Sequence, residues 1–278
     1  MNLKLNLCLL VMLLLGLLPI TVPVPVPVPV SVYGDPSYIK FFYLVLQWPN
    51  AFCNVNCCCN SLRQKFSIHG FWPQVANGNS TFCKPLLPLQ EEYVHDIEKQ
   101  LSIDWPNLIC SWGNFGFWKY QWEKHGNRSK LDHRSYFDTA MKLKAKNVPD
   151  LLSTLRQSNI VPSETRKYQV KSIQDAIVAK IGWRPRIKCI NYSNNGDVQI
   201  HEIHFCVKPP PTAEVQEFEF INCRRRPYYM GCGDHEDNEV YFSPEKNNLT
   251  ATGNEFISSS LTLPRRQTQS EEEAEDEL

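Results

Sequence analysis

The eleven cysteines of this 278-residue chain constrain its fold more than any other feature. Cys8 lies in an apolar N-terminal segment, so the rest of the chain keeps ten, and an even number in an oxidising compartment predicts a disulfide framework. The spacing matches no zinc motif, because three consecutive cysteines cannot place all their thiolates on one metal. We expect no metal site and a disulfide-stabilised domain built on Cys53, Cys57, Cys58, Cys59, Cys83, Cys110, Cys189, Cys206, Cys223 and Cys232.

Residues 1–34 predict a secretory signal with a Val-Pro segment. A weakly basic start leads into an apolar run close to signal-peptide length, with cleavage expected after Gly34. The segment VPVPVPVPV follows the apolar run, and its alternating prolines cannot continue a helix, which disfavours a membrane span. We expect a secreted, extracellular protein without a membrane anchor, with the vacuole or the endoplasmic-reticulum lumen as alternatives. Four N-glycosylation sequons agree with export and begin at Asn79, Asn127, Asn191 and Asn248.

The charges balance over the whole chain but are unevenly distributed. There are 29 basic and 29 acidic side chains, and residues 271–277 hold six of the acids. Residues 246–278 are therefore expected to form a polar, acidic, disordered tail. The final EDEL resembles an endoplasmic-reticulum retrieval signal, although Glu275 replaces the usual Lys or His. Without the tail the body of the chain is mildly positive, which permits a polyanionic partner without requiring one.

Apolar periodicity predicts one α+β domain over residues 35–245. An aromatic and β-branched strand buried on both faces is expected at residues 38–48, and a short strand at 65–68. Helical spacing predicts helices over 89–101, 112–127, 136–148, 150–159 and 170–181. Three further strands follow at 186–192, 197–207 and 217–223. We expect an antiparallel sheet packed against several helices, stabilised by disulfides.

Two short segments, FSIHGFWP and WEKHG, carry candidate functional residues. In the first, His69 lies beside a glycine and three residues before Trp72. A titratable imidazole next to bare backbone and a large aromatic ring suits a ring-bearing substrate. Taken alone, a structural role for this histidine is the simpler explanation.

The second segment supplies another imidazole. In a helix, Gln121 and His125 are four residues apart and Lys124 lies on nearly the same face, so an amide, an ammonium and an imidazole converge on one point. Gly126 would suit the C-cap, where the helix dipole favours a protonated histidine. The alternative is a helix whose tryptophans pack in the core while its polar residues face solvent.

The available groups favour chemistry that needs neither metal nor cofactor. The sequence has no glycine-rich phosphate loop, no nucleophilic Ser or Cys context and no catalytic pair of carboxylates, and the odd separation of His201 and His204 on a strand disfavours chelation. Two imidazoles can accept and donate protons near neutral pH. RNA brings its own nucleophile, the 2′-hydroxyl, so it needs a base, an acid and positive charge, which Lys124 supplies. Trp72 offers a stacking surface for an unpaired base.

These segments resemble the secreted ribonuclease T2 family. FSIHGFWP and WEKHG are similar to its two active-site segments, whose usual forms are close to F-T-I-H-G-L-W-P and H-E-W-x-K-H-G-T-C. The strand ending in LQWP, the cysteine cluster after it and EIHFC extend the resemblance from Tyr38 to Cys232. The resemblance implies an α+β fold with an antiparallel sheet. It also implies metal-independent cleavage of single-stranded RNA through 2′,3′-cyclic phosphates to 3′-phosphates.

The resemblance also implies roles for individual residues. His69 is expected to be the general acid, His125 the general base, and Lys124 the group that stabilises the pentavalent phosphate. The expected substrate contacts are Trp72 at the first base, Gln47 and Phe117 at the second base, and Tyr120. The implied disulfides join Cys53 to one cysteine of the run 57–59, Cys110 to another, Cys189 to Cys232, and Cys206 to Cys223.

Three residues depart from the family pattern. Tyr120 and Gln121 stand where the family usually has His-Glu, and an amide at 121 can bind a phosphate oxygen but cannot raise the pKa of His125 as a carboxylate would. We still count Gln121 in the catalytic set and expect activity at a reduced rate. Arg128 replaces the family cysteine whose usual partner corresponds to Cys83, which suggests a rewired bridge from Cys83 to the cysteine run.

The biological role is predicted from the residues of the first motif, FSIHG, and from Gln121. Both are similar to plant self-incompatibility ribonucleases, which favours a monomeric pistil factor that degrades RNA in incompatible pollen tubes and meets an F-box-type pollen partner. One alternative is a housekeeping or defence ribonuclease. Others are a catalytically impaired storage or recognition protein, and a secreted binding module with incidental histidines.

Overall fold

The computed structural model describes residues 39–56, 58, 64–75, 87–109, 113–192, 196–211, 217–224, 230–233, 235 and 237–244. Several sequence predictions therefore fall outside the described residues. They concern the N-terminal signal, the acidic tail, the sequons at Asn79 and Asn248, and the pairing of Cys57, Cys59, Cys83 and Cys110.

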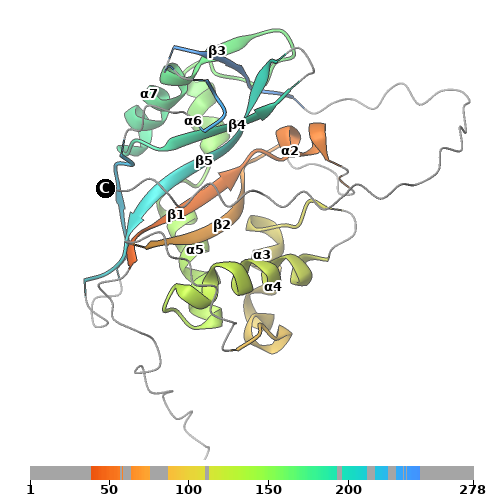
Figure 1. The fold of residues 1–278 in the computed structure, drawn as a ribbon, viewed down its shortest axis with the longest axis vertical. Coiled ribbons are helices and arrows are strands. Elements are labelled where there is room, and N and C mark those ends of the chain that lie inside the picture. Colours follow the sequence, from red (N-terminus) through yellow and green to blue (C-terminus); the bar gives the residue numbers. More distant parts are fainter. Residues whose placement is uncertain are drawn as a thin grey trace, which may run out of the picture. The chain divides into compact units, whose positions relative to one another are not determined.

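The described residues form an α+β structure around a seven-stranded sheet (Figure 1). The strands are β1 Ile39–Gln47, β2 Ser67–Val75, β3 Lys167–Gln169, β4 Arg186–Asn191, β5 Val198–Lys208, β6 Glu219–Ile221 and β7 Glu239–Tyr241. The helices are α2 Pro49–Val55, α3 Glu98–Asp104, α4 Asn114–Lys124, α5 His133–Asn147, α6 Leu151–Gln157 and α7 Val170–Ile181. Short 3₁₀ turns are η3 Glu91–Tyr93, η4 His95–Ile97 and η5 Gly126–Arg128.

Strand β5 is the centre of the sheet. The order is β2-β1-β5-β7-β3, and β4 and β6 also pair with β5. The pairs are antiparallel apart from β5 with β7, which meet in parallel where Gln199 faces Tyr241. The sheet is thus mixed rather than antiparallel throughout, because β6 runs opposite to β5 whereas the later strand β7 runs in the same direction as β5.

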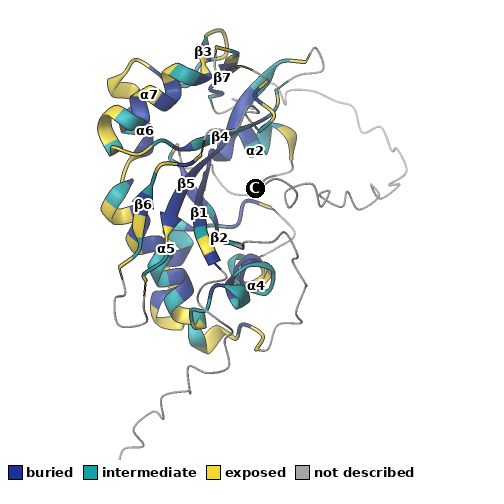
Figure 2. Ribbon diagram, turned by 60° about the vertical axis from the view of Figure 1, so that its left-hand side comes forward, coloured by how far each residue is buried: buried dark blue, intermediate teal, exposed yellow. Residues whose placement is uncertain are grey.

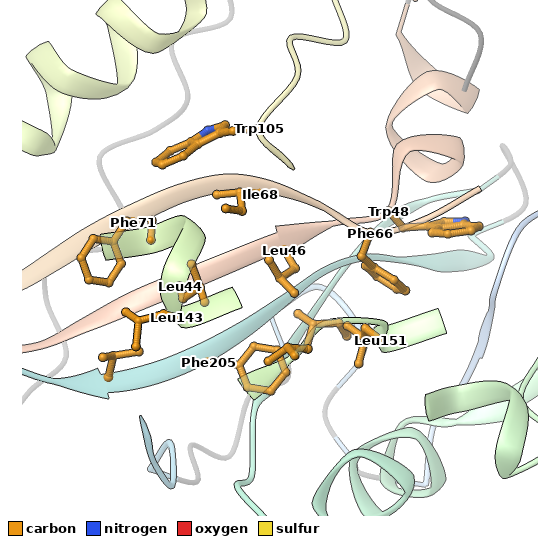
Figure 3. Close-up of a cluster of buried hydrophobic side chains, with 14 of the residues drawn as sticks. Leu44, Leu46, Trp48, Phe66, Ile68, Phe71, Trp105, Leu143, Leu151 and Phe205 are labelled. Carbon is orange, nitrogen blue, oxygen red and sulfur yellow. The ribbon is translucent and has the colours of Figure 1, made fainter. Parts of the chain in front are cut away.

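One face of the sheet packs against helices and forms the main core (Figure 3). Leu44 and Leu46 of β1 point to the same side as Phe71 of β2, and all three are fully buried. The Tyr136 hydroxyl on α5 donates a hydrogen bond to the Phe71 carbonyl oxygen at 2.8 Å, which ties that helix to the sheet. Figure 2 shows the buried residues along β1 and β5 and exposed residues on the outer sides of α5, α6 and α7. Burial is nearly continuous along β1 and β5 rather than alternating, which agrees with the prediction of a strand buried on both faces at residues 38–48.

Side chains of the opposite parity on β1 and β5 lie on the other face of the sheet. Tyr43 pairs with Cys206, Val45 with His204, and Gln47 with Glu202. Residues that face each other across an antiparallel pair share a face, so this side carries an imidazole and a carboxylate. The sheet thus separates an apolar core from a face that holds ionisable groups.

Three disulfides are present in the described residues. They are Cys53–Cys58, Cys189–Cys232 and Cys206–Cys223, with Cα separations of 5.5, 4.9 and 5.2 Å. These bridges confirm the implied pairings for Cys53 with the cysteine run and for the four later cysteines. Because Cys206–Cys223 clamps β5 to the residues after β6, it stabilises the central strand, and such a bridge contributes about 2–4 kcal/mol.

The helix expected over residues 89–101 is interrupted. The structure has η3, then η4, and then α3, with Val94 at φ −126° and ψ 0° between the two turns. The predicted apolar positions Leu89, Ile97 and Leu101 are still buried, and so is Val94. Val94 lies three residues before Ile97 and seven before Leu101, so it belongs to the same apolar face, and the interruption leaves that face in the core.

Candidate active site

His69 occupies a β-bulge in β2. Val45 of β1 faces Gly70 and the next residue, Leu46, faces Ile68, so His69 is the extra residue on its strand. A bulge changes the alternation of side chains, and bulges are frequent next to active sites for that reason. His69 and Trp72 are three residues apart, yet their ring centroids are 5.2 Å apart in an edge arrangement. The bulge is what places both side chains on the ionisable face.

Glu202 of β5 lies beside His69. Its side chain is 1% exposed, and its Oε1 is 2.6 Å from Nδ1 of His69 while its Oε2 is 2.7 Å from Nε2 of His204. Burial acts to raise the pKa of Glu202, but the charge of His69 and the hydrogen bonds from both imidazoles outweigh burial and hold that pKa well below its usual range. The carboxylate is therefore ionised, and Lys188 of β4 adds a cation 3.7 Å from Oε2.

Helix α4 carries the second motif, as the sequence predicts. The Nε1 groups of its tryptophans donate to backbone carbonyl oxygens, from Trp118 to that of buried Trp105 at 2.8 Å and from Trp122 to that of exposed Leu87 at 2.9 Å. The helix ends at its C-cap residue, His125, rather than at Gly126 as predicted. Position 126 needs glycine for space, because a Cβ there would lie 2.3 Å from Cε3 of Trp122. The Trp122 ring therefore packs closely against the Gly126 backbone and fixes the chain directly after His125.

Trp72 joins the two histidine motifs. Its indole stacks on His125 with ring centroids 5.1 Å apart, and it is in an edge arrangement with His69. Its Nε1 donates to Oε1 of Gln121 at 3.1 Å, and Gln121 is buried. A Cβ at Gly70 would lie 1.9 Å from Nε1 of Trp72, so this ring position requires glycine two residues before the tryptophan.

The predicted convergence of Gln121, Lys124 and His125 is only partial. Gln121 accepts a hydrogen bond from Trp72, whereas Nζ of Lys124 donates to the Tyr120 hydroxyl at 3.1 Å. Tyr120 is 37% exposed, so the Lys124–Tyr120 pair lies towards solvent. The other sequence-predicted residues lie within the site: Phe117 stacks over His69 with centroids 6.2 Å apart, and Gln47 is buried next to Glu202 in the sheet register.

The two imidazoles have electrostatic surroundings of opposite sign. Burial, and then the positive charges of Lys124, His69 and Arg128, lower the pKa of His125 well below its usual value. His69, by contrast, has the ionised carboxylate of Glu202 at hydrogen-bond distance. One imidazole is therefore kept neutral and ready to accept a proton, while the other has a counter-charge for its protonated form.

Sequence reasoning missed Glu202 and the structural partners around it. The sequence signal is in DVQIHEIHFCV, where Glu202 and His204 are two residues apart and so share one face of the strand. His201 lies at a register irregularity opposite Lys188 and Cys189; its ring stacks on Phe52 while the His204 ring meets Trp72. Within the described ranges, no group of three or more His, Cys, Asp or Glu side chains is arranged to hold a metal ion.

Comparison with known proteins agrees with this geometry. The family model for the Ribonuclease T2 family matches residues 39–223. The chain belongs to the ribonuclease T2 family. It is 35% identical to Ribonuclease 3 of Arabidopsis thaliana over 68% of this chain and 84% of that protein. It is 30% identical to Ribonuclease S-7 of Nicotiana alata over 76% of this chain and 91% of that protein.

A solved structure supports the same assignment. The crystal structure of RNase NT in complex with 5′-AMP superposes with a TM-score of 0.61 at 31% identity, over 74% of this chain and 98% of the other. The T2 fold is thus confirmed together with the family. As for membranes, the helices found in the described residues are too short or too polar to cross one.

Proposed function

We propose that this T2-family ribonuclease is a secreted, metal-independent endoribonuclease that cleaves single-stranded RNA. The observation that carries the proposal is the pair of imidazoles on either side of Trp72. His125 is neutral beside cations, and His69 faces the carboxylate of Glu202. An acid and a base set apart by their surroundings are what an RNA 2′-hydroxyl needs in order to attack its own phosphate.

The reaction follows from these two proton positions. His125 removes the proton from the 2′-hydroxyl, the 2′-oxygen bonds to phosphorus, and the bond from phosphorus to the 5′-oxygen breaks as His69 protonates that oxygen. The product is a 2′,3′-cyclic phosphate. In the second step water replaces the leaving ribose, His69 now accepts its proton and His125 returns one to the 2′-oxygen, which leaves a 3′-phosphate. Lys124 supports the charge that develops on the phosphorane.

Single-stranded RNA fits the side chains around the histidines. Unstacked bases bind to aromatic side chains and to amide groups. In a duplex the base faces are already stacked, and the 2′-oxygen, phosphorus and 5′-oxygen cannot align for the reaction. Half-buried Trp72 and the exposed ring of Tyr120 are the aromatic contacts, whereas Phe117 and Gln47 are buried and reach a base only if neighbouring side chains move. Because the nucleophile belongs to the substrate, no step requires a metal to activate water.

The proposed biological role is that of a pistil factor in self-incompatibility. It is supported by the FSIHG wording and by Gln121, and the relatives named above include both an S-ribonuclease and a ribonuclease outside that group. A housekeeping or defence enzyme is the second candidate, favoured by the higher identity to Ribonuclease 3. Transcript confined to the style would support the first role, and induction in leaves under phosphate starvation or senescence would support the second.

The activity is tested with the secreted protein, single-stranded RNA and EDTA. We expect cyclic phosphate and then 3′-phosphate products. His69→Ala and His125→Ala should each lower kcat by roughly 10²–10⁴-fold, which is what general acid–base catalysis contributes. His95→Ala is the matched control, because His95 is exposed on η4 away from the site. Equal activity in all four proteins, or cleavage abolished by EDTA, would contradict the proposal.

A further inference from the structure

Glu202 is a buried carboxylate that the reaction steps above do not use. It lies on the central strand, paired with Gln47 of β1 and with Lys188 of β4, and its side chain is 1% exposed. A group so enclosed cannot touch an RNA substrate. Whatever it contributes must act through the side chains that it contacts.

The contact with His69 fixes which nitrogen of that imidazole is available. An ionised carboxylate can only accept hydrogen bonds, so Nδ1 of His69, 2.6 Å from Oε1, carries the hydrogen. The other nitrogen, Nε2, is then the one that exchanges a proton with substrate. Side-chain rotation about His69 would break this contact, so the carboxylate sets the orientation of the ring as well as its tautomer.

His204 holds the carboxylate from the other side. Its Nε2 donates to Oε2 at 2.7 Å, and burial lowers the pKa of His204, so this imidazole is neutral. The groups that face Glu202 are thus His69 from β2, Lys188 from β4, and His201 and His204 from β5 itself; Nδ1 of His201 is 3.9 Å from Oε1. Each oxygen of the carboxylate has one short contact with an imidazole.

We propose that Glu202 is the positioning residue for His69, with His204 as the donor that keeps the carboxylate in place. The inference rests on the proposed function for its catalytic meaning. A buried carboxylate on Nδ1 holds an imidazole in one tautomer and stabilises its protonated form, which is the form that a general acid needs. With an amide at position 121, this carboxylate from β5 supplies the negative charge next to the histidines.

The variant that isolates the charge is Glu202→Gln. Its amide oxygen can still accept from Nδ1 of His69, and His204 can change tautomer to accept from the amide nitrogen, since Nδ1 of His204 has no hydrogen-bond partner among the described residues. We expect kcat on a dinucleoside monophosphate to fall roughly 10- to 100-fold, a part of the 10²–10⁴-fold that acid–base catalysis contributes. KM should stay within about twofold. Glu202→Asp, which keeps the charge but shortens the side chain, should recover part of kcat.

The pH profile separates positioning from a merely structural role. Loss of the counter-charge makes protonated His69 less stable, so the alkaline limb of the kcat profile should move to lower pH in Glu202→Gln. The matched control is Asp104→Asn. Asp104 is also a largely buried carboxylate, paired with Lys144 at 2.8 Å, but it lies outside the site. That control should lose stability and keep the wild-type pH profile.

Imidazole NMR provides a readout that does not depend on activity. We expect the neutral imidazole of His69 in the wild type to carry its hydrogen on Nδ1, and expect a mixture of tautomers in Glu202→Ala. Hydrogen on Nε2 in the wild type would overturn the proposal. So would an unchanged kcat and pH profile in folded Glu202→Gln, or a rise in KM alone. A wild type without ribonuclease activity would contradict the proposed function, while the tautomer result would still decide the contact.

Discussion

The indole ring of Trp72 stacks on the imidazole of His125, with ring centroids 5.1 Å apart and planes 28° apart. One face of the indole is therefore covered by a residue of the site itself. A base that stacks on Trp72 must use the other face or move His125 aside. Because the same indole is also in an edge arrangement with the ring of His69, Trp72 sets the distance between the two histidines as well as offering a surface to substrate.

A first prediction concerns Gly70→Ala, because the indole of Trp72 occupies the space that a side chain at position 70 would need. The new methyl group would lie 1.9 Å from Nε1 of Trp72, so the ring must move and its hydrogen bond to Gln121 must break. We expect kcat to fall on the order of 10²-fold, as for an ångström-scale displacement of a positioning group. Stability should drop by about 1–3 kcal/mol from overpacking.

Steady-state kinetics and denaturant unfolding check this prediction against Gly116→Ala. Gly116 lies in α4, where a Cβ would meet nothing within 4 Å. Alanine there should stabilise the helix by about 0.5–1 kcal/mol and leave kcat unchanged. Equal activity of the two alanine variants would show that the Trp72 position does not matter for turnover.

A second prediction concerns Gln121→Glu. The carboxylate would keep the acceptor for Trp72 and place a negative charge near His125, whose pKa is lowered by burial and then by Lys124, His69 and Arg128. An added anion raises the pKa of a nearby imidazole. Since His125 must be neutral to act as a base, the acid limb of kcat/KM should move to higher pH, and the plateau rate should rise. If the pH profile of kcat/KM were the same in Gln121→Glu and the wild type, position 121 would have no electrostatic effect on His125.

A third prediction concerns stability at acidic pH. Burial lowers the pKa of His201 to about 4, although Glu202 acts to raise it. In the unfolded chain this histidine titrates near 6.5, so between those pH values the unfolded state binds more protons and the fold loses stability as pH falls. The full effect of this shift is about 3 kcal/mol.

The variant His201→Phe measures that contribution. Phenylalanine keeps a ring against Phe52 and removes the buried Nε2, which has no hydrogen-bond partner in the described residues. Urea titrations at pH 7.5 and pH 5 should show a smaller loss of stability in the variant than in the wild type. If the two proteins lost the same amount, the low pKa of His201 would be wrong.

A fourth prediction distinguishes two sequons. The amide oxygen of Asn127 is buried beside the active site, whereas Asn191 is exposed at the end of β4. An oligosaccharyltransferase needs an accessible side chain in a surface segment. In protein secreted from plant cells, peptide mass spectrometry after deglycosylation should find Asn191 modified and Asn127 unmodified. A glycan on Asn127 would place a large sugar next to His125 and contradict this prediction.

Much of the fold follows from the sequence because its long elements are strongly periodic. β1 and α7 match their expected ranges closely, since β1 is a continuous run of aromatic and β-branched residues and α7 repeats its apolar residues at the helical period. The two short strands β3 and β7 were not predicted, because three residues carry no period and their pairing is decided by distant partners. The parallel contact between β5 and β7 was missed for the same reason.

The candidate site was predictable as two motifs but not as one arrangement. His69 and His125 were identified from their neighbours in sequence and from the family resemblance. The bulge at His69 depends on the register between β1 and β2, and the sequence around His69 does not determine that register. Glu202 is 133 residues from His69, and only the pairing of β5 with β1 brings it close to that histidine.

The central position of strand β5 determines which part of the active site unfolds first on heating. Around Glu202 the strand is hydrogen-bonded to β1 on one side and to β4 on the other, so its amides open only when the whole sheet unfolds. His125 lies at the end of α4, where helices fray first. Moderate heat should therefore open the end of α4 and displace His125, the proposed base. The backbone amides of β5 around Glu202, which holds the proposed acid His69, should stay protected from hydrogen exchange. Turnover would then vanish before the sheet melts, and return as soon as the helix end closes again.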